Sequence, residues 1–181
     1  MKHTSVTLAP LTADDREQFI LDNQWAFKHG AMMEFGERDD HVGEDGEIIS
    51  RETIERCIDE PQNETYRVIL DGRRVGGVIL RIDKETRHNH LELFFVSPEE
   101  HSRGIGYGAW CAVEALHPET RVWETCTPYF EKRNIHFYVN KCGFRIVEFY
   151  HAFHEASHSP EEERKDNEGP DEMFRFLKEM P

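Results

Sequence analysis

The spacing of apolar residues switches several times between a strand period of two and a helix period of about 3.6, which predicts a mixed α/β order. The pattern begins with a short strand at residues 6–8. A helix follows, opened by Thr12 with Asp15 at the capping-box distance, and we expect it to fray near Gly30. A second helix has a serine cap, a stripe of three apolar residues and a terminating proline, at Ser50, Ile54, Cys57, Ile58 and Pro61.

Three strand-like runs of apolar residues follow the second helix. They span residues 66–70, 75–82 and 90–96. Asp71 and Gly72 separate the first two runs, and this dipeptide is typical of a hairpin corner. The third run stops at Ser97 and Pro98, because proline lacks the N–H that a sheet ladder needs. We therefore expect three neighbouring antiparallel strands.

The second half of the chain predicts two helices and three strands. The first helix has its apolar face at Ala109, Ala112, Val113 and Leu116. A strand at 122–125, a helix at 130–142 capped by Gly143, a strand at 145–153 and a last edge strand at 174–177 complete the order. Acidic stretches near 34–47 and 155–172 predict loops within one domain that spans residues 1–181.

A glycine-bearing turn joins the third strand of the first half to the helix that follows it. Gly104, Gly106 and Gly108 stand at the start of this helix, where backbone N–H groups are unpaired and the helix dipole is positive. An anion can approach such a helix start closely, so the turn predicts a pyrophosphate cradle. A nucleotide P-loop is excluded, because Ala109 and Trp110 replace its Lys-Ser/Thr pair. A dinucleotide fingerprint is excluded too, since residues 97–103 separate the strand from the first glycine.

The residues around this turn resemble motif A of the GNAT superfamily, the acetyl-CoA-dependent N-acetyltransferases. Val96-Ser97-Pro98 and the segment from His101 to Gly106 match the Val-x-Pro and Gln/Arg-x-x-Gly-x-Gly pattern in register, with His101 in place of Gln or Arg. A second frame, from Arg103 to Gly108, fits the short pattern two residues later. The order of elements resembles the GNAT fold over nearly the whole chain. The resemblance implies a mostly antiparallel mixed sheet of about seven strands, flanked by helices and splayed between two central strands.

The resemblance also implies which residues bind acetyl-CoA. The backbone of the third strand is expected to polarise the thioester carbonyl as an oxyanion hole. The N–H groups of the turn are expected to hold the diphosphate, with a positive charge from Arg103, and Asn134 is expected to touch the pantetheine arm. The cofactor-binding set is Phe94, Phe95, Val96, His101, Ser102, Arg103, Gly104, Ile105, Gly106, Tyr107, Gly108 and Asn134.

Acetyl transfer to an amine needs a base, because the ammonium must lose its proton before it attacks. The candidates, in order of preference, are Glu92, Glu124 and His90. By the two-residue strand period, His90 and Glu92 share a face with Phe94 and Val96. Relatives often carry the acid six residues before the valine, where this chain has His90.

A tyrosine serves as general acid for the departing thiolate in many relatives, four residues before a Gly-Phe pair. Here Tyr138 lies five residues before Gly143, and one residue is 100 degrees of helix rotation. Either the helix end is remodelled by a bulge or a lengthened cap, or Tyr138 is not the acid. The sequence leaves both possibilities open.

The composition of the chain limits which partners we expect it to bind and in which cell compartment we expect it. The formal net charge of -14 excludes a protein that tracks nucleic-acid phosphates and favours a cationic or neutral acceptor. The four cysteines have no C-x-x-C spacing, and we find no signal peptide or membrane-spanning run, so we expect a cytoplasmic protein without membrane contact. We expect no metal site. His151, His154 and His158 start in a strand and run into a polar loop, which is not a preformed ligand shell.

The sequence supports two functions of different classes. The first is an acetyl-CoA-dependent N-acetyltransferase, acting as a monomer or a homodimer, that transfers the acetyl group to a primary amine of a small molecule or peptide by direct attack. The second is a non-catalytic acyl-CoA sensor or interaction module on the same fold, motivated by His101 and by the shifted acid and tyrosine. The absent Lys-Ser/Thr pair disfavours a nucleotide-dependent phosphotransferase. The acceptor amine stays open.

Overall fold

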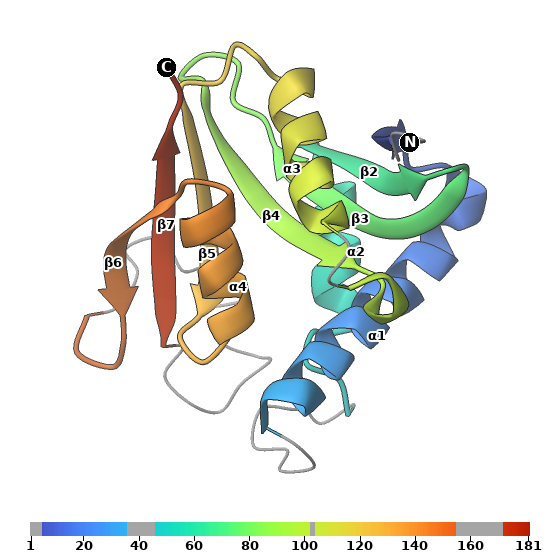
Figure 1. The fold of residues 1–181 in the computed structure, drawn as a ribbon, viewed down its shortest axis with the longest axis horizontal. Helices are drawn as coiled ribbons and strands as arrows, with labels where there is room; N and C mark the ends of the chain where they lie inside the picture. Colours follow the sequence, from blue (N-terminus) through green and yellow to red (C-terminus); the bar gives the residue numbers. More distant parts are fainter. Residues whose placement is uncertain (1–4, 36–45, 102–103, 155–171) are drawn as a thin grey trace.

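The protein is built around one seven-stranded mixed sheet, seen in a computed structural model that describes residues 5–35, 46–101, 104–154 and 172–181 (Figure 1). The strand order is β1-β2-β3-β4-β5-β7-β6, and every neighbouring pair is antiparallel except β4 and β5. Helices α1 and α2 cover one face of the sheet, and α3 and α4 lie on the other. The mixed α/β sheet of seven strands flanked by helices is therefore confirmed.

The elements that the structure describes follow the order expected from the sequence. The strands are β1 (Val6–Pro10), β2 (Asn63–Leu70), β3 (Arg73–Arg81), β4 (His88–Val96), β5 (Val122–Pro128), β6 (Arg145–Tyr150) and β7 (Met173–Glu179). The α-helices are α1 (Arg16–Phe35), α2 (Arg51–Asp59), α3 (Ile105–Leu116) and α4 (Lys132–His136). Three short turns are η1 (Ala13–Asp15), η2 (Pro98–Glu100) and the π-helical η3 (Phe137–Lys141). None of the described helices has the length and apolar character that crossing a bilayer requires.

The first helix begins differently from the prediction. Thr12 makes no capping hydrogen bond, and the 3-10 turn η1 precedes α1. The Asp15 carboxylate accepts hydrogen bonds from Arg67 at 2.7 and 3.0 Å and from Arg74 at 2.9 Å. Because it binds these arginines of the sheet, it does not complete a capping box with Thr12. The helix also continues past Gly30 to Phe35, five residues further than expected. Most of the acidic stretches near 34–47 and 155–172 lies outside the described residues.

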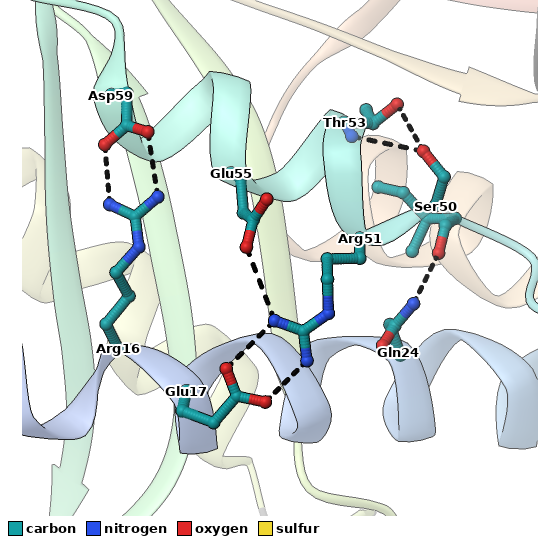
Figure 2. A network of polar contacts seen from close by, with 9 residues as sticks. Arg16, Glu17, Gln24, Ser50, Arg51, Thr53, Glu55 and Asp59 are labelled. Carbon is teal, nitrogen blue, oxygen red and sulfur yellow. Dashed lines mark hydrogen bonds and ion pairs between the residues drawn. The ribbon is translucent and has the colours of Figure 1, made fainter.

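Two ion pairs join α2 to α1, and a serine caps the start of α2 (Figure 2). Arg16 of α1 binds both oxygens of Asp59, at 2.5 and 2.8 Å, and Arg51 of α2 binds both oxygens of Glu17, at 2.5 and 2.9 Å. The expected cap at Ser50 is confirmed, since its hydroxyl accepts the backbone N–H of Thr53 at 3.1 Å. The two helices therefore form one unit on their face of the sheet.

The central hairpin is confirmed, and its second strand has a feature that the sequence analysis missed. Asp71 and Gly72 form the corner with φ values of 49° and 77°, as a type I′ turn requires. In β3, a Cβ atom at Gly76 would lie 2.3 Å from the carbonyl oxygen of Phe95, and one at Gly77 would lie 2.3 Å from the Phe19 ring. These two glycines let β4 and α1 pack directly on β3.

A β-bulge at Glu92 changes the faces of β4. Ile79 pairs with Leu93 and Leu80 pairs with Leu91, so Glu92 is the extra residue of β4. Phe94 packs on the α3 side of the sheet, in one hydrophobic cluster with Trp110 and in another with Ile105. Val96 belongs to the cluster of Ile105. His90 and Glu92 lie on the other face. The expectation that all four residues share one face is therefore wrong, because the bulge shifts the alternation by one residue.

The last strand is central rather than at the edge. Strand β7 pairs with both β5 and β6, and β6 forms the edge of the sheet. Two antiparallel ladders hold β7, and Phe176 at its centre is fully buried. Strand β5 runs three residues beyond the predicted end, and β6 ends at Tyr150, where His151 and His154 form an isolated bridge.

The helix predicted over residues 130–142 is split in two. Helix α4 gives way to the π-helical turn η3, in which the N–H of Cys142 donates to the carbonyl of Phe137 at 3.0 Å. A π-turn holds one residue more than an α-turn. Gly143 follows with a φ of 80°, so the expected glycine cap is confirmed. The helix end that carries Tyr138 is therefore remodelled, and the role of Tyr138 as the acid stays a prediction.

Candidate active site

The site lies where β4 and β5 separate. The two strands pair in parallel at only three positions, the last being His90 with Glu124. Beyond this point the hydroxyl of Thr125 donates a hydrogen bond to the carbonyl of Leu91 at 3.0 Å, and the strands then diverge (Figure 1). We call the space between residues 91–96 of β4 and residues 125–128 of β5 the wedge. Beyond His90, the described backbone of β4 has no backbone pairing with β5.

The glycines at the start of α3 have different roles. Gly104 is the N-cap with a φ of 74°, and a Cβ there would meet no atom of the described residues within 4 Å, so none of these residues blocks the helix start. A Cβ at Gly106 would lie 3.3 Å from the Phe137 ring, and one at Gly108 would lie 3.0 Å from Val6. Packing against β1 therefore explains Gly108, whereas Gly104 fits an anion cradle.

His101 fixes the turn between β4 and α3. Its Nε2 lies 3.0 Å from the carbonyl oxygen of Val96, and its Nδ1 lies 2.7 Å from a guanidinium nitrogen of Arg133 at the start of α4. Because the guanidinium can only donate, Nδ1 accepts from Arg133, and Nε2 carries the hydrogen that it donates to the carbonyl oxygen of Val96. Burial and the charge of Arg133 lower the pKa of His101, which keeps the ring neutral. His101 thus links the end of β4 to the start of α4 beside the wedge.

The first candidate base, Glu92, lies at the bulge beside the wedge. Its carboxylate forms an ion pair with the Nε of Arg81 on β3 at 3.3 Å, and its side chain is 28% exposed. The bulge therefore places a partly solvated carboxylate at the point where the two strands begin to separate.

The second candidate, Glu124, is bound more tightly. Arg175 of β7 donates to both its oxygens, at 2.7 and 3.0 Å, and the Nε2 of His88 lies 2.7 Å from one of them. Burial acts to raise the pKa of Glu124, but the hydrogen bonds and positive charge of Arg175 outweigh it and hold the pKa below its usual value. Arg175 also contacts Glu148 of β6 at 3.3 Å. Glu124 is thus the centre of an ion-pair network.

The third candidate, His90, stacks on His88 with ring centroids 5.2 Å apart. Burial, followed by the charge of Arg81, lowers the pKa of His90 to about 4. The ring is therefore neutral. Within the described residues, neither of its nitrogens has a hydrogen-bond partner.

Tyr138 lies on the opposite face of the sheet from the candidate bases. Its ring packs against Phe144 and Phe176, with centroids 5.6 and 5.5 Å away, and its side chain is buried. Burial raises the pKa of Tyr138, and a hydrogen bond with Thr125 works against this shift. Tyr138 is thus a protonated hydroxyl next to the threonine that closes the wedge.

The remaining predicted residues fall around the wedge and the start of α3. Phe95 is buried against Phe19, while Asn134 is exposed on α4 with its amide 3.5 Å from the hydroxyl of Thr127. Ile105 is buried and Tyr107 is half exposed. Ser102, Arg103 and His158 lie outside the described residues. His154 does not stand alone, since its Nε2 lies 2.9 Å from Glu148.

Sequence reasoning missed four residues of this site: His88, Thr125, Arg133 and Arg175. For His88 a signal was present, because His-x-His on a strand places both rings on one face. The others come from elements distant in sequence, and only the sheet order brings them to the wedge.

Comparison with known proteins identifies the family. Residues 23–144 match the family model of the acetyltransferase (GNAT) family, which is more than half of the chain. The chain belongs to the GNAT acetyltransferase family. The resemblance of its motif A is therefore confirmed, and with it a general role in acetyl transfer.

The GNAT chain has relatives in sequence and in structure. It is 46% identical over 169 residues to the uncharacterized protein YrkN of Bacillus subtilis strain 168, covering 92% of this chain and 89% of YrkN. An acetyltransferase structure from Thermus thermophilus matches with a TM-score of 0.65 at 16% identity, over 99% of this chain and 100% of that one. The spermidine N-acetyltransferase of Vibrio cholerae, in complex with CoA and spermine, matches with a TM-score of 0.65 at 14% identity, over 97% and 95% of the two chains. These two structures share the fold.

Proposed function

We propose that this protein is an N-acetyltransferase that moves an acetyl group from acetyl-CoA to a primary amine. The observation that carries the proposal is the wedge, since β4 and β5 pair at three positions and then diverge beside the open N-terminus of α3. Such an arrangement offers unpaired backbone donors of a strand and of a helix start to one extended ligand. The Vibrio cholerae enzyme, solved with CoA and spermine, supports a CoA-type cosubstrate and an amine acceptor.

The residues present fit acetyl-CoA. The first N–H groups of α3 precede the first helical bond, from Gly108 to Gly104, so they have no partner within the helix and can bind the diphosphate. Along β4 the backbone groups point alternately to the two neighbouring strands, and the carbonyl of Phe95 faces Gly76 of β3, so the N–H groups of Phe94 and Val96 are the ones turned toward the wedge that can polarise the carbonyl. Asn134 is exposed on α4, and we assign it a contact with the pantetheine arm. When bound, acetyl-CoA supplies the acetyl group as an activated thioester.

Glu92 is the proposed base. It is partly solvated and ion-paired to Arg81 at 3.3 Å, so it can take the proton of the amine directly or through a water molecule. Glu124 is engaged by Arg175 and His88, and we assign it the role of holding the β4–β5 junction.

Tyr138 is the proposed acid. In an α-helix the family's tyrosine lies four residues before the glycine, and the π-turn η3 absorbs the one additional residue of this chain. The raised pKa keeps the hydroxyl protonated. It can then donate its proton to the thiolate as the carbon–sulfur bond breaks and the new carbon–nitrogen bond forms.

The test is a thiol-release assay with acetyl-CoA and a panel of amines, beside calorimetry of acetyl-CoA binding. We expect Glu92→Gln and Tyr138→Phe to lower kcat by about 10²–10⁴-fold without loss of acetyl-CoA affinity. Glu85→Gln, in an exposed turn, and Tyr66→Phe, on β2, are the matched controls and keep wild-type kcat. Absence of acetyl-CoA binding would overturn the proposal. Binding without turnover on any amine would favour an acyl-CoA sensor.

A further inference from the structure

Two histidines of β4 and a glutamate of β5 bring metal-ligand atoms together at the closed end of the wedge. One ring nitrogen each of His88 and His90 and one oxygen of Glu124 all lie within 4.8 Å of one another. The arrangement follows from the backbone, because residues two apart on a strand share a face and the parallel register places Glu124 opposite His90. The three side chains therefore converge on one point from two strands.

The contacts of these side chains fit a first coordination shell. His88 and Glu124 already touch, with 2.7 Å between Nε2 and Oε2, so an ion would take the place of the proton between them. Among the described residues, no group bonds to the ring nitrogens of His90. Arg175 donates to Glu124 from β7 and would remain as the outer partner that orients the carboxylate, as ligating carboxylates commonly require.

The charges around the cluster allow a divalent cation. Two guanidinium groups, of Arg81 and Arg175, face it, and three carboxylates balance them: Glu92, Glu124 and Glu148. Negative groups therefore outnumber the positive ones when both histidines are neutral. Two imidazoles and one carboxylate favour zinc-class ions over magnesium or calcium, which prefer oxygen ligands alone.

We propose that His88, His90 and Glu124 bind one zinc-class divalent ion that joins β4 to β5 at their last paired position. This role goes beyond acetyl transfer. The two strands are held by three paired positions before they diverge, so an ion bridging them stabilises the junction from which the wedge opens. The fourth coordination position is left for water.

The experiment uses the full chain without a polyhistidine tag, freed of metal by a chelator that is then removed. Co²⁺ is titrated while visible absorption is followed, and Zn²⁺ binding is measured by calorimetry and by the shift in Tm. We expect one equivalent to bind, with the intense visible bands of a low-coordinate cobalt site and a raised Tm. In His90→Gln the affinity falls by more than about a hundredfold, since outer partners alone are worth about 10–100-fold.

The control is the double variant His151→Gln with His154→Gln, which removes a histidine pair at the end of β6 and should bind as wild type does. Wild-type protein that binds no Co²⁺, or His90→Gln that binds it unchanged, overturns the proposal. Loss of binding in the control would do the same, because it would place the ion at the end of β6. Visible absorption, calorimetry with Zn²⁺ and the shift in Tm do not involve acetyl-CoA. Failure of the metal site and failure of acetyl transfer can therefore be distinguished.

Discussion

Thr125 of β5 donates its hydroxyl to the carbonyl of Leu91 on β4 at 3.0 Å, one residue beyond the last paired position of the two strands. Both side chains are buried. The bond replaces a ladder hydrogen bond with a side-chain one, so β4 and β5 stay joined while their backbones begin to separate. It therefore marks the closed end of the wedge.

Replacing Thr125 by valine should remove this bond while it preserves the shape of the side chain. The carbonyl of Leu91 is then left buried without a partner, which costs about 1–3 kcal/mol. Urea unfolding measures the loss. Thr7→Val, the same change at an exposed position of β1, should stay within about 0.5 kcal/mol of wild type. Equal effects in the two variants would show that the Leu91 contact contributes nothing.

The buried ion pair between Asp15 and Arg67 supports a second prediction. Each side chain is 3% exposed, and the Arg67 guanidinium also lies 5.1 Å from the centre of the Phe19 ring. Asp15→Asn should lower stability by about 3–5 kcal/mol, because it leaves the guanidinium charge buried and poorly compensated. Asp59→Asn removes the exposed partner of Arg16 and should leave the unfolding midpoint unchanged (Figure 2). A midpoint for Asp15→Asn equal to that of Asp59→Asn would contradict this assignment.

Glycine-to-alanine substitutions at two positions should change the stability of the protein in opposite directions. At Gly77 the added methyl group would lie 2.3 Å from the Phe19 ring and 2.6 Å from the Phe95 ring, so we expect a loss of about 3 kcal/mol from overpacking. At Gly30, inside α1, an added Cβ would meet no other part of the described structure within 4 Å, and alanine should stabilise the helix by up to about 1 kcal/mol. Thermal unfolding of both variants checks the pair. A stable Gly77→Ala protein would mean that α1 does not rest on β3.

The cysteines should differ sharply in reactivity. Burial raises the pKa of the Cys142 thiol to about 12, so almost none of it is thiolate at pH 8, and its side chain is 2% exposed. Cys111 and Cys126 are exposed. Alkylation of the native protein, followed by peptide mass spectrometry, should label these two and spare Cys142 until the chain is unfolded. Labelling of native Cys142 at the rate of Cys111 would refute the burial.

Local sequence patterns were enough to predict the order of elements, the hairpin corner at Asp71 and Gly72, and the strand-turn-helix that carries motif A. These features follow from local rules: side-chain period, proline and glycine backbone preferences, and helix capping. The same rules correctly indicated Ser50 as a cap. They failed at Thr12, because a distant pair of arginines binds Asp15.

Other parts of the site depend on strand register and on which strands are neighbours in the sheet, and these are fixed by long-range contacts. A bulge at Glu92 moved side chains of β4 to different faces, and the π-turn η3 set the place of Tyr138. Strand β7 entered between β5 and β6, which brought Arg175 to Glu124. A one-residue shift in a strand or helix reorients every following side chain, and long-range pairing selects that shift. The family and the strand-turn-helix of motif A could therefore be predicted from the sequence, while the partners of each catalytic candidate could not.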